Sequence, residues 1–177
     1  MEARATAPGK SFPIGATVSP DGVNFSVLSK SSTRMELLLF NHLDDTKPAT
    51  VISLDSWGNR TYHYWHVFVP GLRPGQIYGY RADGPFEPQR GLRFDPEKIL
   101  LDPYGRAVAV PKEYSRVAAS KAGDNCPTAM KSVVVDNSAY DWEGDQPLHR
   151  PIPQTVIYEM HVAGFTRHPS SGVAPEK

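Results

Sequence analysis

The stretch TYHYWHVFVPGLRPGQIYGYRADGP, residues 61–85, decides the fold class. Its first half is dense in aromatic and β-branched residues, and side chains along an extended chain alternate between two faces. This period places Trp65 and Val67 opposite Tyr64 on a strand that we expect over residues 61–71. The Pro-Gly pair that follows predicts a turn into a second strand, QIYGYRAD. The stretch therefore predicts two neighbouring β-strands joined by a turn.

The residues before this stretch repeat the same pattern. Apolar and polar residues alternate in VNFSV (23–27) after a Pro-Asp-Gly turn, and strands are also expected at RMELLLF (34–40) and VISLD (51–55). Seventeen prolines and fourteen glycines punctuate these short runs, which argues against long helices. Short strands at a spacing of roughly 10–15 residues are typical of an antiparallel β-sandwich. We therefore predict a mostly β fold with an immunoglobulin-like sandwich.

The pattern changes after residue 85. The sequence predicts one helical turn near 96–101, a polar loop over 111–131 and a short strand at 131–136. The apolar run TVIYEMHV (155–162) is typical of a buried strand, and a polar loop follows it. We interpret the region between the sandwich and this run as an irregular connector.

Composition excludes several classes of partner. Lysine plus arginine and aspartate plus glutamate both number 19, and no basic run occurs, so we expect neither nucleic acid nor a membrane surface as partner. The start lacks an apolar signal region, and no apolar run reaches the ~18 residues of a membrane span. A single cysteine, Cys126, permits no internal disulfide and favours a reducing compartment. We therefore expect a cytoplasmic protein.

Candidate catalytic groups are few. Glycoside cleavage uses two carboxylates roughly 5–9 Å apart, whereas Asp141, Glu143 and Asp145 fall in a Gly-containing stretch typical of a solvated loop. His63 and His66 point to opposite faces of the expected strand, and the sequence has neither HExxH nor a Cys/His zinc spacing. We expect no catalytic residue, no metal site and no cofactor in this chain.

Clustered aromatic residues offer the best candidate binding site. Sugar rings present apolar C–H faces that can stack on aromatic planes, while sugar hydroxyls need polar neighbours. The turn SWGNRTY supplies Trp57, Asn59 and Tyr62 in that combination, and we predict these three as carbohydrate contacts. The alternative is that these aromatics only pack against the surface or core, as most strand aromatics do.

Several blocks together carry a family resemblance. The blocks SFPIGATVSPDGVNFSVLS, GLRPGQIYGYRADGP, RFDPEKILLDPYGRAV and TVIYEMHVAGFT occur in this order. This arrangement resembles the isoamylase-type glycogen and starch debranching enzymes of glycoside hydrolase family 13. The resemblance implies that residues 9–110 form an N-terminal sandwich related to carbohydrate-binding module family 48. It further implies a connector at 111–153 and, at 154–177, the first strand of a truncated catalytic (β/α)8 barrel.

The same resemblance implies which catalytic residues of the family are absent from this sequence. Family members carry the nucleophilic aspartate, the acid glutamate and a third aspartate on later barrel strands, and motifs such as DxxxNH do not occur here. Ala163 stands where related sequences often have arginine. The resemblance implies an inactive, noncatalytic portion of an α-1,6-glucan debranching hydrolase, whose partners are an α-glucan (glycogen, starch or amylopectin) and the missing barrel. A plastid is a second possible location if the source is a plant.

Two other readings stay open at this level. The sandwich could be a glucan-binding module in its own right, or an unrelated sandwich that binds protein. If the chain is part of a debranching enzyme, the run at 155–162 lacks the barrel strands that would pair with it. We therefore expect no stable sheet there. Exposed apolar side chains at Ile157, Tyr158 and Met160 would favour lost intramolecular partners over an evolved interface.

Overall fold

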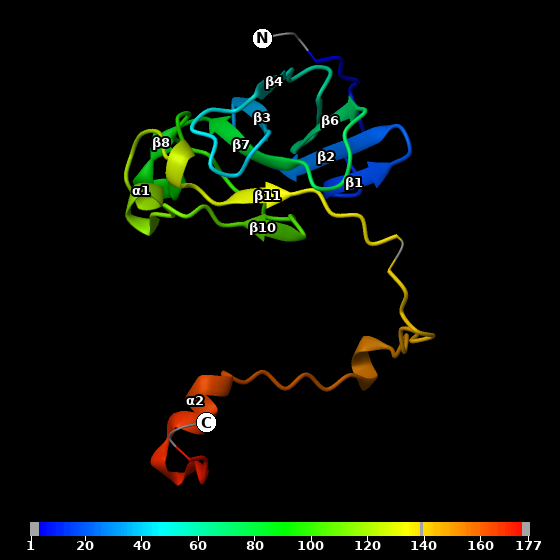
Figure 1. Cartoon of the computed structure of the whole chain (residues 1–177), viewed down its shortest axis with the longest axis vertical. Helices are drawn as coiled ribbons and strands as arrows, with labels where there is room; N and C mark the ends of the chain where they lie inside the picture. The colour runs from blue at the N-terminus through cyan, green and yellow to red at the C-terminus, as the bar shows by residue number, and fades with distance from the viewer. Residues whose placement is uncertain (1–3, 139, 175–177) are drawn as a thin grey trace. The chain divides into compact units, whose positions relative to one another are not determined.

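The computed structural model describes residues 4–138 and 140–174 (Figure 1). The chain divides into two compact units, Met1–Ala139 and Tyr140–Lys177. The first unit contains the sheets and the hydrophobic core, and the second contains short helical segments. No helix in the described part of the chain is long and apolar enough to cross a membrane.

The first sheet is antiparallel and has the strand order β1-β2-β6-β5. Its strands are β1 (Gly15–Ser19), β2 (Gly22–Leu28), β5 (Arg60–Thr61) and β6 (Tyr64–Pro70). The central pair β2–β6 runs in register from Gly22↔Pro70 to Leu28↔Tyr64. This pairing joins a strand near the start of the chain to the aromatic stretch that the sequence singled out.

The second sheet is also antiparallel, with the order β10-β11-β7-β3-β4. Its strands are β3 (Arg34–Phe40), β4 (Thr50–Leu54), β7 (Ile77–Asp83), β10 (Ala107–Ala109) and β11 (Lys131–Val133). A small ribbon pairs β8 (Phe86–Glu87) with β9 (Leu92–Arg93). The helical segments are α1 (Arg116–Ser120), α2 (Val162–Arg167) and the 3-10 turns Pro88–Arg90, Cys126–Thr128, Ile152–Gln154 and Pro169–Ser171.

The two large sheets pack face to face around one core. Alternate residues of β2 and β6 meet alternate residues of β3, β4 and β7, as the period of a strand requires. Phe25 of β2 and Tyr78 of β7 make an edge-to-face contact at 5.0 Å between ring centroids. The core residues are Val23, Phe25, Val27, Met35, Leu37, Leu39, Ile52, Leu54, Trp65, Val67, Val69, Leu72, Tyr78, Tyr80, Ala82 and Val134. The predicted antiparallel sandwich is confirmed.

The outer face of the second sheet is covered by the connector. Leu38, Phe40 and Ile99 form a second buried cluster together with Cys126 and Ala129. Gly79, in the middle of β7, permits this cover, because a Cβ there would lie 3.0 Å from a methyl of Ile99. β3 and β7 are therefore buried on both faces, which explains the nearly continuous apolar run in RMELLLF.

The prediction of a single strand over 61–71 is wrong at residues 62 and 63, where the chain turns between β5 and β6. The chain turns at Tyr62 and His63, so that Thr61 faces Tyr64 and Arg60 faces Trp65 across a tight hairpin. Tyr62 has a φ of +57°, a conformation uncommon outside glycine. β-propensity continues through this turn, so composition alone hides it.

The region after residue 85 also differs from expectation. At 96–101 there is no helix: Lys98 N donates to Asp95 O in a single turn, and Leu100 then bridges to Tyr80 of β7. The expected loop at 111–131 contains the short helix α1, where the Ser115 side chain accepts a hydrogen bond from Ala118 N as an N-cap. The short strand expected at 131–136 is present as Lys131–Val133.

The second unit contains no strand at 155–162 among its described residues. Residues 155–161 have no sheet partner, and α2 begins at Val162. Val156, Ile157 and Tyr158 expose 94%, 85% and 78% of their surfaces. This apolar run therefore has neither a sheet nor a core around it among the described residues.

Candidate functional site: an aromatic loop and a basic groove

The predicted carbohydrate contacts lie on the loop between β4 and β6. Asp55 begins the loop, and its carboxylate accepts a hydrogen bond from Gly58 N at 2.9 Å. Asp55 and Asn59 then bind each other twice: Asn59 N donates to Asp55 O at 2.7 Å, and Asp55 N donates to Asn59 Oδ1 at 3.0 Å. These bonds close residues 55–59 into a compact turn.

Asn59 is occupied by contacts within the protein. Its Nδ2 donates to His66 O at 3.0 Å and to Pro8 O at 3.4 Å, while its main-chain oxygen accepts from His66 N at 2.7 Å. The amide thus joins the loop to β6 and to the N-terminal segment. Asn59 therefore fixes the loop through hydrogen bonds within the protein.

Trp57 and Tyr62 are displayed to solvent by this loop. Trp57 is 93% exposed and Tyr62 is 79% exposed. The Tyr62 ring lies on the His63 ring at 3.7 Å, and its main-chain oxygen accepts from Arg60 Nε at 3.0 Å. Within the described residues, the Trp57 ring pairs with no other aromatic ring. Large apolar rings held in water by an ordered loop can stack on a ligand.

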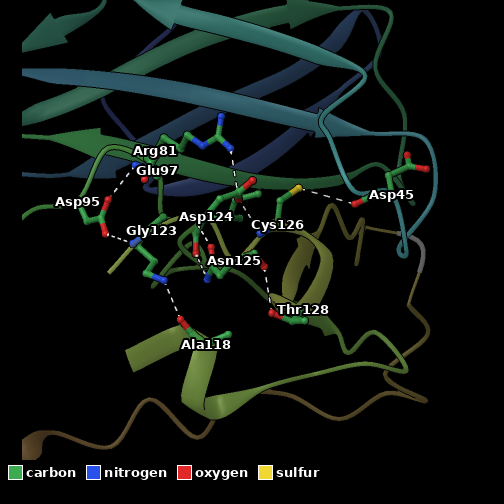
Figure 2. A network of polar contacts seen from close by, with 12 residues as sticks. Asp45, Arg81, Asp95, Glu97, Ala118, Gly123, Asp124, Asn125, Cys126 and Thr128 are labelled. Carbon is green, nitrogen blue, oxygen red and sulfur yellow. Dashed lines mark hydrogen bonds and ion pairs between the residues drawn. The ribbon is translucent and has the colours of Figure 1, made fainter. Parts of the chain in front are cut away.

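A second surface lies on the connector side and was missed by the sequence reasoning. Figure 2 shows the polar contacts that fix its base, where residues 118–128 lie against the turn at 95–99. Asn125, which is buried, accepts from Ile99 N at 2.8 Å through its side chain. Both carboxylate oxygens of Asp95 accept main-chain hydrogen bonds, from Glu97 and Gly123. The bond from Gly123 is the main reason that the pKa of Asp95 is lowered.

These contacts leave a groove on the surface. It consists of two adjoining hollows of about 440 and 710 Å³, which share Arg93, Asp95, Lys98 and Leu100. The larger hollow is walled by Phe86 and Tyr114. Volumes of 300–1,000 Å³ are usual for small-molecule sites. The only sequence signal was the mixture of aromatics and cations between residues 86 and 121, which are too far apart to suggest one site.

Two buried polar side chains, Asp102 and Lys131, join the chain after residue 85 to the sandwich. Tyr78 donates to Asp102 at 2.8 Å, and Asp102 N donates to Ser132 Oγ at 3.0 Å. Burial raises the pKa of Asp102. Burial, together with the neighbouring charge of Asp102, raises the pKa of Tyr78. Lys131 is fully buried and donates to the main-chain oxygens of Leu43 and Cys126 at 2.8 and 3.1 Å, and burial lowers its pKa. These groups are inaccessible, so we assign them to structure.

The sandwich matches a known family of modules. The family model described as carbohydrate-binding module 48 (isoamylase N-terminal domain) matches residues 13–105, more than half of the chain. This match spans the sandwich from just before β1 to just before β10. The chain belongs to this family, which confirms the sequence-based resemblance.

Curated relatives of this chain include an isoamylase and a glycogen debranching enzyme. The chain is 44% identical over 168 residues to isoamylase 1, chloroplastic, of Arabidopsis thaliana, covering 93% of this chain and 21% of that protein. It is 42% identical over 171 residues to the glycogen debranching enzyme of Serratia proteamaculans, covering 92% and 24%. The chain thus spans only about a fifth to a quarter of the length of these relatives.

Solved structures support the fold. A pullulanase from Paenibacillus barengoltzii, in complex with maltohexaose and alpha-cyclodextrin, has a TM-score of 0.54 at 23% identity. The match covers 93% of this chain and 22% of that one. A pullulanase from Bacillus acidopullulyticus gives 0.51 at 20% identity. At such identities the likeness concerns the fold alone.

Proposed function

We propose that this chain is the N-terminal, noncatalytic part of a debranching enzyme that hydrolyses α-1,6-glucosidic branch points in glycogen or starch. The observation that carries the proposal is the pairing of high identity with low coverage: 42–44% identity over more than nine tenths of this chain, but 21–24% of its relatives. Catalysis in the parent belongs to residues outside the matched part. The parent would work in the cytoplasm, or in a plastid if its source is a plant.

The division of the chain follows from this proposal. Residues 9–110 are the carbohydrate-binding module, residues 111–153 the connector, and residues 154–177 the beginning of the catalytic barrel. In the parent, 155–162 would be the first strand of a closed parallel sheet, where both faces of a strand are buried. The exposure of Val156 and Ile157 supports this assignment, because both need a partner on each face.

The module's own role is to hold an α-glucan on the aromatic loop. Trp57 and Tyr62 supply flat apolar surfaces for the pyranose rings, and the bonds between Asp55 and Asn59 order the turn that carries Trp57. A rigid loop reduces the ordering cost that a ligand must offset. The same surface would also serve a stand-alone glucan-binding module, so binding and parentage need separate tests.

Retention on insoluble starch tests the binding role. The purified chain should be retained above an albumin control, and Trp57→Ala should reduce retention severalfold without changing the fold. Phe12→Ala is a matched control, because Phe12 is also a largely exposed aromatic residue but lies outside the loop. Retention equal to albumin, or equal retention of the native chain and Trp57→Ala, would refute the assignment of this loop.

Incubation with amylopectin tests the noncatalytic role. The chain alone should release no linear glucan chains, because we propose that the carboxylate pair required for glycoside hydrolysis belongs to the rest of the parent enzyme. Release of reducing ends above a heat-denatured sample would show that the chain holds its own catalytic groups.

A further inference from the structure

We propose that the groove between the β8–β9 ribbon and the connector binds a phosphorylated sugar. Its cationic side chains would hold the phosphate and its aromatic wall would hold the sugar ring. The groove is separate in sequence from the aromatic loop, and the inference stands whether or not that loop binds starch. Its basis is the charge, burial and shape of the residues that line it.

The charges around the groove are unbalanced. Four cationic side chains line the two hollows, and Asp95 is the one acidic residue among the lining. The cations are Lys30, Arg93, Lys98 and Lys121. The whole sequence has equal numbers of basic and acidic residues, so this excess of positive charge is local. A cleft lined by one sign of charge attracts a ligand of the opposite sign.

Asp95 interacts favourably with Lys98 through its charge, but no groove cation forms a direct ion pair among the described residues. Asp95 accepts a main-chain hydrogen bond on each carboxylate oxygen, at 3.0 Å from Glu97 N and 2.9 Å from Gly123 N. The ion pairs within the described ranges join Arg34 to Glu36, Arg81 to Asp124 and Arg90 to Glu87. None of them uses a cation of the groove.

Lys98 is the central residue because it is buried and lines both hollows. Only 8% of its surface is exposed, and its Nζ donates to Ala118 O at 2.7 Å. An ammonium has three hydrogens, and this single acceptor uses one of them. A buried charge is costly unless it is paired. A phosphate oxygen at the junction of the hollows would supply further acceptors and add negative charge to that of Asp95.

The rest of the groove suits a sugar. The larger hollow exposes Phe86 by 70%, Tyr114 by 39% and Leu100 by 44%. Aromatic and aliphatic surface of this kind can cover the C–H face of a hexose. A free phosphate would contact only the cations and leave this wall bare, so we assign the groove to a sugar that carries a phosphate.

Titration calorimetry on the whole chain tests the proposal, with glucose 6-phosphate, glucose and inorganic phosphate as three separate probes. Glucose 6-phosphate should bind at least about tenfold more tightly than either glucose or phosphate, because it alone contacts both the cations and the aromatic wall. Added salt should weaken its binding. Arg93→Gln and Phe86→Ala should each weaken it about tenfold, by removing a charged hydrogen-bond donor and the ring wall respectively.

Two variants guard this result. Lys98→Met should abolish binding, and its melting temperature reports whether the lost bond to Ala118 has affected the fold. Lys47→Gln, an exposed cation outside the groove lining, should leave binding unchanged. The proposal fails if glucose 6-phosphate does not saturate the chain at about 10 mM, or if Arg93→Gln behaves like Lys47→Gln. It also fails if phosphate or glucose alone binds as tightly as the combined ligand.

Discussion

Replacing Asn59 by alanine separates a structural role for this residue from a ligand contact. The substitution removes the bond from Asp55 N at 3.0 Å and the bond to His66 O at 3.0 Å, together with a longer one to Pro8 O at 3.4 Å. A net contribution of about 1 kcal/mol for each of the two shorter bonds gives a loss of about 2 kcal/mol. At roughly 2–4 °C per kcal/mol, the melting temperature should fall by about 4–8 °C.

Starch binding should weaken in the same variant, because the loop that displays Trp57 would lose its closure. Thermal and urea unfolding followed by circular dichroism measures the first effect, and starch retention measures the second. Trp57→Ala is the matched comparison: its side chain is 93% exposed, so stability should change by less than about 0.5 kcal/mol while retention falls. If Asn59→Ala keeps full stability but loses starch retention, then Asn59 contacts the sugar directly and our structural assignment is wrong.

Three other substitutions test the account of the buried groups and of the second unit. Burial raises the pKa of Asp102 above its unfolded value, so the folded chain holds this proton more tightly and the contribution of Asp102 to stability falls as pH rises from about 4 towards 7. The stability difference between the native chain and Asp102→Asn, from urea unfolding, should therefore shrink over that range; a difference that grows with pH would contradict the assignment. Lys131→Met leaves two carbonyl groups without their donor and should cost about 2 kcal/mol in urea unfolding, whereas an unchanged midpoint would show that the ammonium contributes nothing net. The exposed run around Ile157 should make the chain self-associate at high concentration, and Ile157→Lys should reduce the large species in light scattering; an unaltered size distribution would place the contact elsewhere.

The sandwich could be predicted because its strands obey period two and are separated by Gly/Pro turns. Val23, Phe25 and Val27 lie in the core, as their alternation with Asn24 and Ser26 predicted. The run at 34–40 was harder, because both faces of β3 are buried and its alternation is weak. Its length and its flanking turns were enough to indicate a strand.

The details that sequence reasoning missed depend on contacts between distant residues. The turn at Tyr62 occurs within a β-prone stretch, and only the pairing of Thr61 with Tyr64 reveals it. The structural role of Asn59 depends on Pro8 and His66, neither of which its neighbours in sequence suggest. The groove likewise joins Lys30 with Lys121 through the fold of the connector.

The run at 155–162 illustrates a different limit. Its composition indicates a buried strand, yet residues 155–161 pair with no strand among the residues that the structure describes. A strand needs neighbouring strands to satisfy its main chain and cover its faces. Without such neighbours, the strand-like composition of this run gives no strand among the described residues.

Exchange of this chain into a debranching enzyme tests the central claim most directly. The chain would replace the matching region of the Serratia proteamaculans glycogen debranching enzyme, with which it is 42% identical. Release of linear chains from amylopectin would be measured for this hybrid, for the native enzyme and for the enzyme without the region. We predict that the hybrid regains a substantial part of the native rate and that the deleted form has almost none. A soluble, cooperatively folding hybrid that is no more active than the deleted form would contradict the assignment of this chain to such an enzyme.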